Sequence, residues 1–277
     1  MGPVAEPREA EPAAATATAS GALVLSRLER QHSIAELAMA DGRVDVGDLA
    51  DRFQVTTETI RRDLAHLQEQ RLVRRTHGGA VPWERWRYEP SVAVRDTEHP
   101  QEKQRIAQRA VAELQGEATL LIDSGTTTAQ VARMLPHDRP LTVVTNSIPV
   151  MQALVHNEAV EVVLLGGRVK KSTLAIVDPT GADELSRIVV DLAFVGSDGV
   201  SPEHGFTTPH REEVEIKRAM LRAARRAVVL VDHSKFGNDH LHRIARVEEV
   251  DGVITGTELP EAEARAVSAL GPMVTRA

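Results

Sequence analysis

The sequence predicts an α/β protein in two parts: a small N-terminal helical unit ending in a hairpin, and a larger C-terminal α/β domain with a mainly parallel sheet. Three observations predict this fold class. The length of 277 residues is long for one domain and comfortable for two. Apolar residues recur at helical spacing in residues 23–70, and short apolar runs alternate with amphipathic helical stretches from residue 118 onward.

A first helix is predicted over residues 23–40, and Asp41-Gly42 ends it. Its apolar side consists of Leu28, Ile34, Leu37 and Ala38. Two shorter helices follow, separated by a tight turn at residues 54–56. Their inward-facing residues are Leu49, Phe53, Ile60, Leu64 and Leu67. Thr56 suits the N-cap of the second of these helices, and Glu58 suits the positive end of its dipole.

The outward face of that second helix carries small polar and basic side chains, which is typical of a recognition helix in a DNA major groove. Residues 72–76 then alternate apolar and basic side chains, and residues 77–79 supply a turn, so the unit ends in a basic wing. The predicted DNA contacts are Thr57, Thr59, Arg61, Arg62 and His66 on the helix, with Arg74, Arg75 and His77 in the wing. The alternative is an ordinary helical pair with Arg61 and Arg62 on a solvated face.

A net charge of −7 argues against a globally basic nucleic-acid coat, so DNA binding requires a local patch. Residues 60–90 contain such a patch. Its arginines are Arg61, Arg62, Arg71, Arg74, Arg75, Arg85 and Arg87, opposed by Asp63, Glu69, Glu84 and Glu89. We expect a modest, salt-sensitive affinity that depends on two copies of the domain binding together.

The chain contains no cysteine, which excludes disulfides and thiolate metal sites. It has no apolar run long enough for a membrane helix, and residues 1–20 resemble a disordered tail rather than a signal peptide. These features predict a cytoplasmic protein. The predicted winged helix-turn-helix domain spans 21–80. Residues 81–101 are predicted to be a linker, in which Trp83, Trp86 and Tyr88 pack between domains rather than stack on bases.

The C-terminal domain, predicted over residues 102–277, begins with a helix over 102–114. The predicted strands are 118–122, 141–145, 160–165, 192–195, 227–231 and 250–254. The predicted helices between and after them are 126–135, 148–156, 212–224 and 261–270. This alternation favours a mainly parallel sheet covered on both faces.

Polar residues follow five of these strands, at the edge where open parallel sheets bind ligands. The loop 124–128 offers backbone N–H groups and hydroxyls at a helix N-terminus, which suits a phosphate. Lys235 and Lys217 could neutralise it, and Asp123 and Asp198 could accept hydrogen bonds from sugar hydroxyls. Aspartate and glycine are also ordinary turn formers, Gly166-Gly167 could be a bare turn, and Lys217 could be a solvated helix residue.

The N-terminal segments Val55-Thr-Thr-Glu-Thr-Ile-Arg-Arg-Asp-Leu64 and Arg75-Thr-His-Gly-Gly-Ala80 resemble the signature of the DeoR family of transcriptional regulators. Five C-terminal segments resemble successive motifs of the sensor domain of that family. They are Asp123-Ser-Gly-Thr-Thr-Thr128, Thr145-Asn-Ser147, Leu165-Gly-Gly167, Asp198-Gly-Val200 and Asp232-His-Ser-Lys-Phe236. The loops 177–181 and 207–211 fit the family pattern loosely and are expected to shape ligand choice.

The resemblance implies a regulator, usually a repressor and less often an activator, whose effector is a phosphorylated sugar. It also implies a C-terminal fold similar to ribose-5-phosphate isomerase. The predicted effector-binding residues are Asp123, Ser124, Gly125, Thr126, Thr127, Asn146, Gly166, Gly167, Asp198, Gly199, Lys217 and Lys235. The expected partners are double-stranded operator DNA, the phosphorylated sugar and at least one further copy of the chain, in a dimer or tetramer.

An alternative function is an aldose–ketose isomerase attached to a DNA-binding module, with Asp123, Asp198, Glu213 or Glu215 as the base. The sequence lacks the Lys-Gly-Gly-Gly-Gly stretch of pentose-phosphate isomerases, which favours binding without catalysis. No cofactor is expected, because no dinucleotide fingerprint is present. No metal is expected either, because the spacing of His233, His240 and His242 matches no known metal-binding pattern.

Overall fold

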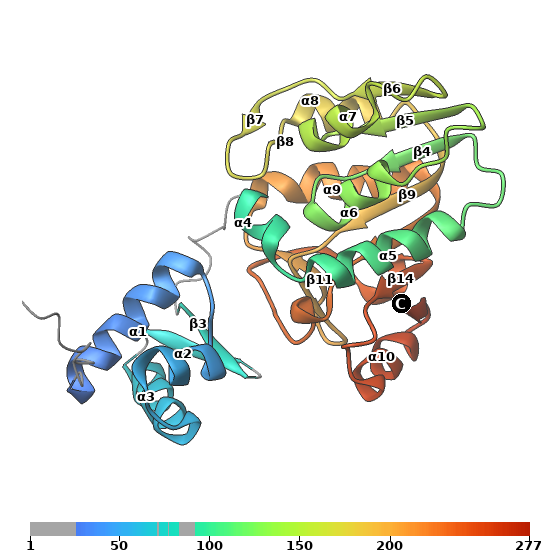
Figure 1. Cartoon of the computed structure of the whole chain (residues 1–277). Helices are drawn as coiled ribbons and strands as arrows, with labels where there is room; N and C mark the ends of the chain where they lie inside the picture. Colours follow the sequence, from blue (N-terminus) through green and yellow to red (C-terminus); the bar gives the residue numbers. More distant parts are fainter. Residues whose placement is uncertain (1–25, 71, 77, 83–91) are drawn as a thin grey trace, which may run out of the picture.

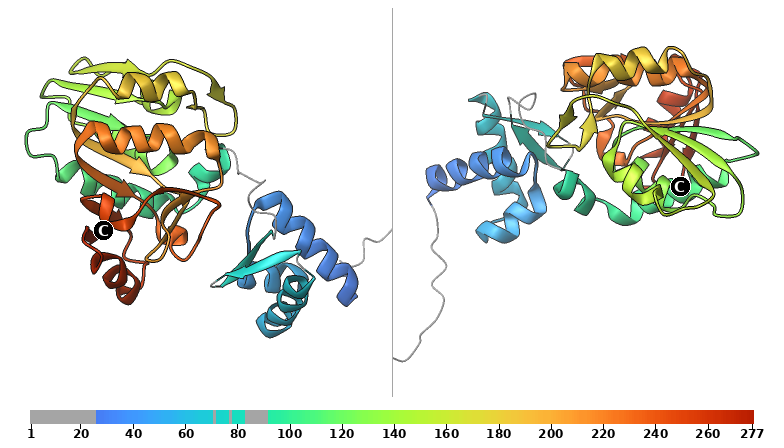
Figure 2. Two further views of the ribbon diagram at one scale, coloured as in Figure 1. Left: turned by 180° about the vertical axis from the view of Figure 1, so that it is seen from behind. Right: turned by 90° about the horizontal axis from the view of Figure 1, so that it is seen from above.

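The computed structural model describes residues 26–70, 72–76, 78–82 and 92–277. The predicted tail (1–20), the wing residue His77 and the linker aromatics Trp83, Trp86 and Tyr88 lie outside the described residues. We call residues 26–82 the winged unit and residues 92–277 the C-terminal domain. Each part has its own apolar core. Figures 1 and 2 show the ribbon of both parts.

The winged unit contains the three predicted helices and the predicted hairpin. Its elements are α1 (Arg27–Asp41), β1 (Val44–Asp45), α2 (Val46–Phe53), α3 (Thr57–Glu69), β2 (Val73–Thr76) and β3 (Gly79–Pro82). The Thr56 side chain accepts a hydrogen bond from the backbone N–H of Thr59, which confirms the predicted N-cap of α3. Ile60, Leu64 and Leu67 are buried as predicted.

The exposure of Leu28 and the number of strands differ from the predictions for this unit. Leu28 is 76% exposed, because it lies in the first turn of α1, before Ile34, where the apolar core of the unit begins. The hairpin gains a third strand, since β1 pairs antiparallel with β3. That pairing requires glycine at position 79, where a Cβ atom would lie 2.0 Å from the Val44 carbonyl oxygen.

Asp63 joins α3 to α1 and is not part of the surface charge, contrary to its prediction as an acid opposing the basic patch. Its carboxylate is buried and accepts hydrogen bonds from Arg30 Nε at 2.6 Å and Gln31 Nε2 at 2.7 Å. Arg27 Nε lies 3.7 Å from Asp63 Oδ1. Because a buried charge is costly without partners, this contact sets how α1 packs on α3.

The C-terminal domain is built on a seven-stranded, wholly parallel sheet in the order β15-β14-β12-β9-β4-β5-β6. Its strands are β4 (Thr119–Ile122), β5 (Leu141–Thr145), β6 (Val160–Leu164), β9 (Val190–Gly196), β12 (Ala224–Leu230), β14 (Gly252–Thr255) and β15 (Met273–Arg276). The six predicted strands and the parallel sheet are confirmed. The edge strand β15 was not predicted, because it is short, half-exposed and without an apolar run.

Helices cover both faces of this sheet (Figure 1). They are α5 (Pro100–Ala112), α6 (Thr126–Arg133), α7 (Ile148–Leu154), α8 (Pro179–Leu185), α9 (Arg211–Ala223) and α10 (Glu261–Ser268). Strand residues alternate between faces: Leu120 and Ile122 pack with α5, α6 and α7, whereas Leu121 packs with α8 and α9. Apolar packing covers both faces of the sheet. Because its strands are parallel, the carboxyl ends of β4, β5, β9 and β12 lie along one edge.

Smaller strands and one short helix lie outside this framework. They are β7 (Val169–Lys170), β8 (Ala175–Ile176), β10 (Gly199–Ser201), β11 (Gly205–Thr208), β13 (His242–Ala245) and α4 (Val92–Thr97). The segment predicted as a linker, residues 81–101, thus includes the end of β3, all of α4 and the first residues of α5. None of the described helices is both long and apolar enough to cross a membrane.

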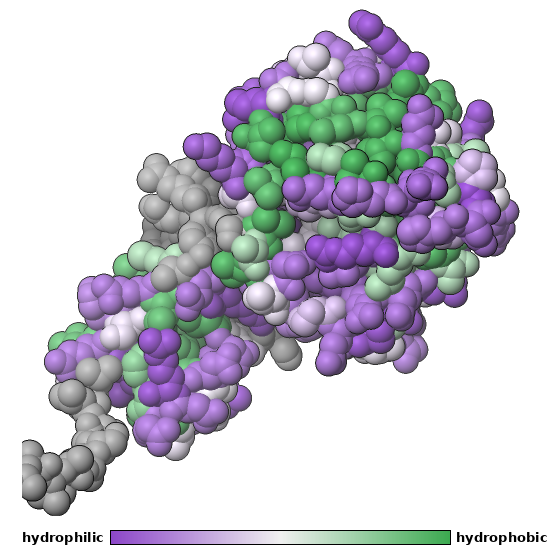
Figure 3. Space-filling model, turned by 45° about the horizontal axis from the view of Figure 1, so that its top comes forward, coloured by the Kyte–Doolittle hydropathy of each residue, from purple (hydrophilic) through white to green (hydrophobic). Residues whose placement is uncertain are grey.

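Exposed apolar side chains gather on one part of the C-terminal domain surface (Figure 3). Val155, just after α7, is 57% exposed, and Leu164, at the end of the edge strand β6, is 38% exposed. An edge strand with apolar neighbours can pair with or pack against another chain.

The Asp63 contact predicts the behaviour of a variant of the winged unit. Asp63→Ala leaves the buried Arg30 without its carboxylate, so the unit should lose about 3–5 kcal/mol of stability. Hydrogen exchange of the full chain should then accelerate in α1 and α3 and stay unchanged in residues 92–277. The exposed neighbour Glu69→Ala serves as a control. Unaltered exchange in α1 and α3 of Asp63→Ala would contradict the structural role.

Candidate functional site

The loop from β4 into α6 forms one wall of a cleft at the carboxyl edge of the sheet, and Ser124, Gly125, Thr126 and Thr127 line it. Gly125 has φ +150°, which is unfavourable for other residues, and a Cβ there would lie 3.0 Å from Thr128 Oγ1. Gly125, the N-cap residue of α6, has no side chain that could cap the helix. Backbone donors at the positive end of a helix dipole therefore face the cleft, which suits an anion.

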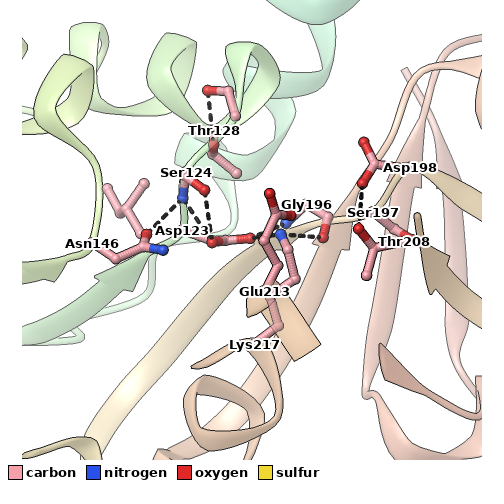
Figure 4. A network of polar contacts seen from close by, with 12 residues as sticks. Asp123, Ser124, Thr128, Asn146, Gly196, Ser197, Asp198, Thr208, Glu213 and Lys217 are labelled. Atoms are coloured by element: carbon pink, nitrogen blue, oxygen red, sulfur yellow. Dashed lines mark hydrogen bonds and ion pairs between the residues drawn. The ribbon is translucent and has the colours of Figure 1, made fainter. Parts of the chain in front are cut away.

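Beneath this loop, Asp123 is fully buried and organises three elements (Figure 4). Its Oδ1 accepts from the Ser124 N–H at 2.7 Å, and its Oδ2 accepts from the Gly196 N–H at 3.0 Å and from Lys217 Nζ. Asn146 Oδ1 accepts from the same Ser124 N–H at 2.9 Å. Asp123 and Asn146 thus hold the loop from behind, and Asp123 does not line the cleft.

Lys217 of α9 is buried and lines the cleft, so it is not the solvated helix residue considered from sequence. Its Nζ also donates to the Gly196 carbonyl oxygen at 3.1 Å. Burial alone would lower the pKa of Lys217, but the carboxylates of Asp123, Glu213 and Asp198 raise it. Lys217 is therefore a fixed positive charge in the floor of the cleft.

Asp198 lies on another wall, and two side chains hold its carboxylate. Thr208 Oγ1 donates to its Oδ2 at 2.9 Å, and Arg95 Nη2 of α4 lies 3.3 Å from its Oδ1. Burial alone would raise the pKa of this carboxyl, but Arg95, Lys217, His240 and Lys235 together lower it. Asp198 therefore stays ionised and acts as a hydrogen-bond acceptor.

A second cluster of charges comes from α5 and from the end of β12. Lys103 is buried and its Nζ donates to the Arg95 carbonyl oxygen at 2.6 Å. Burial lowers the pKa of Lys103, and Asp232 only partly offsets this effect. Burial alone would raise the pKa of Asp232, but Lys235, Ser234 and Lys103 lower it. Lys103, Asp232 and Lys235 all line the cleft.

The structure brings most of the sequence-predicted effector residues together. Those that line the cleft are Ser124, Gly125, Thr126, Thr127, Asp198, Lys217 and Lys235, and those directly behind the loop are Asp123 and Asn146. Gly166 and Gly167 instead form the turn after β6, where a Cβ on Gly167 would lie 2.4 Å from Asp178 Cβ. Gly199 begins β10, and a Cβ there would lie 2.1 Å from the Asn238 carbonyl oxygen. These three glycines do not line the cleft.

The sequence-predicted set omitted several cleft residues. They are Val92, Arg95, Lys103, Thr128, Thr173, Gly196, Ser197, Glu213, Leu230, Val231 and Asp232. Asp232 and Ser197 follow predicted strands, so the strand-end pattern could have included them. Val92, Arg95 and Lys103 precede the sheet in the chain, and no strand-end pattern reaches them.

The described residues also place His99, Asp232 and His233 with candidate ligand atoms within 4.8 Å of one another. This trio differs from the His233, His240 and His242 set considered from sequence. Glu102 Oε2 lies 2.7 Å from His233 Nδ1, and Lys103 and Lys235 act electrostatically on Asp232. Two lysines beside the carboxylate oppose binding of a cation.

The candidate DNA interface lies on α3 and β2. Thr57, Arg61 and Arg62 are exposed on α3, and Arg74 and Arg75 are exposed on β2. Thr59 and His66 are half-buried: Thr59 Oγ1 lies 2.9 Å from Thr56 Oγ1, and His66 Nε2 lies 3.0 Å from Gln70 Nε2.

Arg61 Nη1 lies 3.9 Å from Glu58 Oε2, and Arg62 Nε lies 3.5 Å from Glu58 Oε1. Exposed pairs of this kind are weak, so both guanidinium groups remain able to reach another anion.

Comparison with known proteins assigns both parts of the chain. Residues 30–85 match the DeoR-like helix-turn-helix domain, and residues 98–257 match the DeoR C-terminal sensor domain. The HTH-type transcriptional regulator GlpR of Haloferax volcanii is 38% identical over 228 residues, covering 82% of this chain and 89% of the relative. The glycerol-3-phosphate regulon repressor of Escherichia coli K12 is 32% identical over 242 residues, covering 85% and 93%.

Solved structures show weaker likeness. Ribose 5-phosphate isomerase A from Methanocaldococcus jannaschii has a TM-score of 0.36 and 22% identity, over 50% of this chain and 55% of that one. A probable sor operon regulator from Shigella flexneri has a TM-score of 0.42 and 11% identity, over 62% and 89%. Neither likeness carries an argument about function.

The domain matches and the identity to these relatives agree with the DeoR motifs in both parts of the sequence. The alignments cover most of this chain and most of each of these two relatives. The chain therefore belongs to the DeoR family of transcriptional regulators.

Proposed function

We propose that this regulator is a repressor of carbohydrate-metabolism genes, released from double-stranded operator DNA when a phosphorylated sugar binds the cleft. The observation that carries the proposal is the cleft itself, where the uncapped N-terminus of α6 faces Lys103, Lys217 and Lys235 beside the carboxylate of Asp198. A relative is named a glycerol-3-phosphate regulon repressor, which supports the same ligand chemistry. A repressor of this kind acts in the cytoplasm.

The proposed ligand has a phosphate at one end and hydroxyls at the other. The phosphate would bind the backbone of residues 125–127 with Lys103 and Lys235, because a helix N-terminus and ammonium groups all favour an anion. The hydroxyls would donate to Asp198 and Glu213, which line the cleft as acceptors. Asp123, predicted from sequence to bind hydroxyls, would instead hold the loop and Lys217 in place.

We propose that the cleft binds its ligand without converting it. An isomerase needs a carboxylate free to remove a proton from carbon. Here Asp123 pairs with Lys217, Asp198 pairs with Arg95, and Glu213 Oε1 lies 2.7 Å from Lys170 Nζ. Pairing with a cation stabilises the ionised form of a carboxylate and weakens it as a base. Glu215 is 70% exposed and does not line the cleft.

On DNA, α3 would enter the major groove and the wing would contact phosphates. Arg61, Arg62 and Thr57 are exposed on α3 and could reach base edges, while Arg74 and Arg75 on β2 could bind the backbone. The contacts assigned to Thr59, His66 and His77, and the domain limits 21–80 and 102–277, stay predictions from sequence.

Arg62→Ala should lower affinity for the operator by about tenfold to hundredfold, because one base contact contributes roughly 1–3 kcal/mol. The measurement is a gel shift on DNA upstream of the protein's own gene and its neighbours. Arg265→Ala, which removes the same charge from α10, is the control. Affinity of Arg62→Ala within about twofold of the unmodified protein would contradict the recognition-helix assignment.

Lys103→Met should weaken binding of phosphorylated sugars by about tenfold or more, because a charged hydrogen bond is lost. Calorimetry with glycerol 3-phosphate, glucose 6-phosphate and fructose 1-phosphate measures this, and the exposed Lys171→Met is the control. The sugar phosphate that binds should also release DNA in the gel shift. Equal affinity of Lys103→Met and the unmodified protein would exclude Lys103 from the site. Conversion of a sugar phosphate into its isomer, detected by phosphorus NMR, would favour the isomerase.

The same titration has an expected pH dependence. Because the pKa of Lys103 is lowered, its amine loses its proton at a lower pH than an ordinary lysine. Affinity for the phosphate should be full below this pKa and fall as the pH rises through it. Lys103→Arg keeps its charge and should retain affinity at alkaline pH. A parallel decline in both proteins would argue against titration of Lys103.

We also propose a homo-oligomer formed through the C-terminal domain, supported by the exposed apolar side chains beside β6. Sedimentation velocity of the full chain should show a dimer or tetramer. Leu164→Glu should shift this assembly toward the monomer, whereas Leu241→Glu, which replaces a 70% exposed leucine elsewhere, should not. An assembly unaffected by Leu164→Glu would place the interface on another surface.

A further inference from the structure

The short helix α4 reaches across the cleft from outside the sheet. Val92 and Arg95 of α4 both line the cleft, although they precede the first strand of the C-terminal domain. Along the chain, α4 is the first described element after β3, the last strand of the winged unit. The chain segment that leaves α4 toward its N-terminus is therefore the one that connects the cleft to the winged unit.

Polar contacts, rather than apolar packing, hold α4 in this position. Its six residues are all described, and none of them is buried. Val92 N–H donates to the Ser172 carbonyl oxygen at 2.7 Å, and Asp96 Oδ1 lies 3.8 Å from Arg133 Nη1. A helix this short has little stability of its own, so its position depends on such contacts.

The two innermost contacts of α4 use the groups that the proposed effector needs. Arg95 Nη2 lies 3.3 Å from Asp198 Oδ1, and both side chains are less than a fifth exposed, at 18% and 19%. The Arg95 carbonyl oxygen accepts from Lys103 Nζ at 2.6 Å. A phosphate bound to Lys103 competes with that carbonyl oxygen, and a hydroxyl bound to Asp198 competes with the Arg95 guanidinium.

We propose that Arg95 is the residue through which the effector controls DNA binding. Without ligand, Arg95 pairs with Asp198 and its carbonyl oxygen binds Lys103, which fixes α4 across the cleft. When a sugar phosphate takes Lys103 and Asp198, Arg95 leaves Asp198 and binds the phosphate, and α4 shifts with it. The effector thus exchanges contacts within the protein for contacts with itself, which favours a second arrangement of α4.

This inference rests on the proposed function and adds the residue that links effector binding to DNA binding. The same cations could bind a ligand without any change in α4, so binding and coupling must be measured separately. Hydrogen exchange reports both within the full-length protein, because residues 124–128 report occupation of the cleft and residues 92–97 report release of α4.

The experiment compares exchange with and without glycerol 3-phosphate, glucose 6-phosphate and fructose 1-phosphate at millimolar concentration. In the unmodified protein, a sugar phosphate that slows exchange in residues 124–128 should accelerate exchange in residues 92–97 by about threefold or more. Arg95→Met should show rapid exchange in residues 92–97 without ligand. Its DNA affinity should change by less than about twofold when sugar phosphate is added. Arg225→Met, a 72% exposed arginine outside the cleft, should behave like the unmodified protein.

The outcomes separate the two proposals. Protection of residues 124–128 with unchanged or slower exchange in residues 92–97 overturns the role of Arg95 and leaves the effector site standing. If no sugar phosphate protects residues 124–128, the proposed effector class fails first. A full response of DNA affinity in Arg95→Met also overturns the coupling, whatever the exchange data show.

Discussion

The buried ion pair between Asp123 and Lys217 is the contact on which the cleft depends. Asp123 directly follows β4, Lys217 belongs to α9, and both bind the backbone of Gly196 at the end of β9. The loss of one partner would leave a buried charge uncompensated, at a cost of about 3–5 kcal/mol. The ion pair therefore fixes β4, β9 and α9 relative to one another at the base of the cleft, and it fixes the position of the loop 124–127. Asp123 is therefore a positioning residue, and substitution there would disturb the fold before it altered ligand contacts.

The charges around the cleft explain why a ligand with mixed chemistry fits best. Arg95, Lys103, Lys217 and Lys235 attract a phosphate, but Asp198, Glu213 and Asp232 lie among them. A simple anion would gain from the cations and suffer repulsion from the carboxylates. A phosphorylated sugar satisfies both, because its hydroxyls donate to the carboxylates while its phosphate binds the cations and the α6 N-terminus.

Before a ligand arrives, the same charges satisfy one another. Asp198 pairs with Arg95, Glu213 with Lys170, and Lys103 donates to the Arg95 carbonyl oxygen. Binding therefore replaces one set of contacts with another, and its net free energy is smaller than the sum of the new contacts. An exchange of this kind is suited to regulation, since Arg95, the group that we propose to be displaced, belongs to the first described helix after the winged unit.

The sequence by itself determined the fold class, the order of the two parts and most of one wall of the cleft. Helical spacing identified Ile60, Leu64 and Leu67 as core residues, and apolar runs identified six strands of the sheet, because both patterns are local consequences of periodicity. Strand-end polarity brought Ser124, Asp198 and Lys235 to one edge, since parallel strands end on the same side.

Only the tertiary structure decided which polar residues face the ligand space and which support them. It buried Asp63 against Arg30, placed Asp123 behind the loop rather than in the cleft, and excluded Gly166, Gly167 and Gly199. It also added Arg95 and Lys103, which lie about twenty or more residues before the first strand-end motif. Their roles arise from contacts between segments distant in sequence, and no local periodicity encodes such contacts.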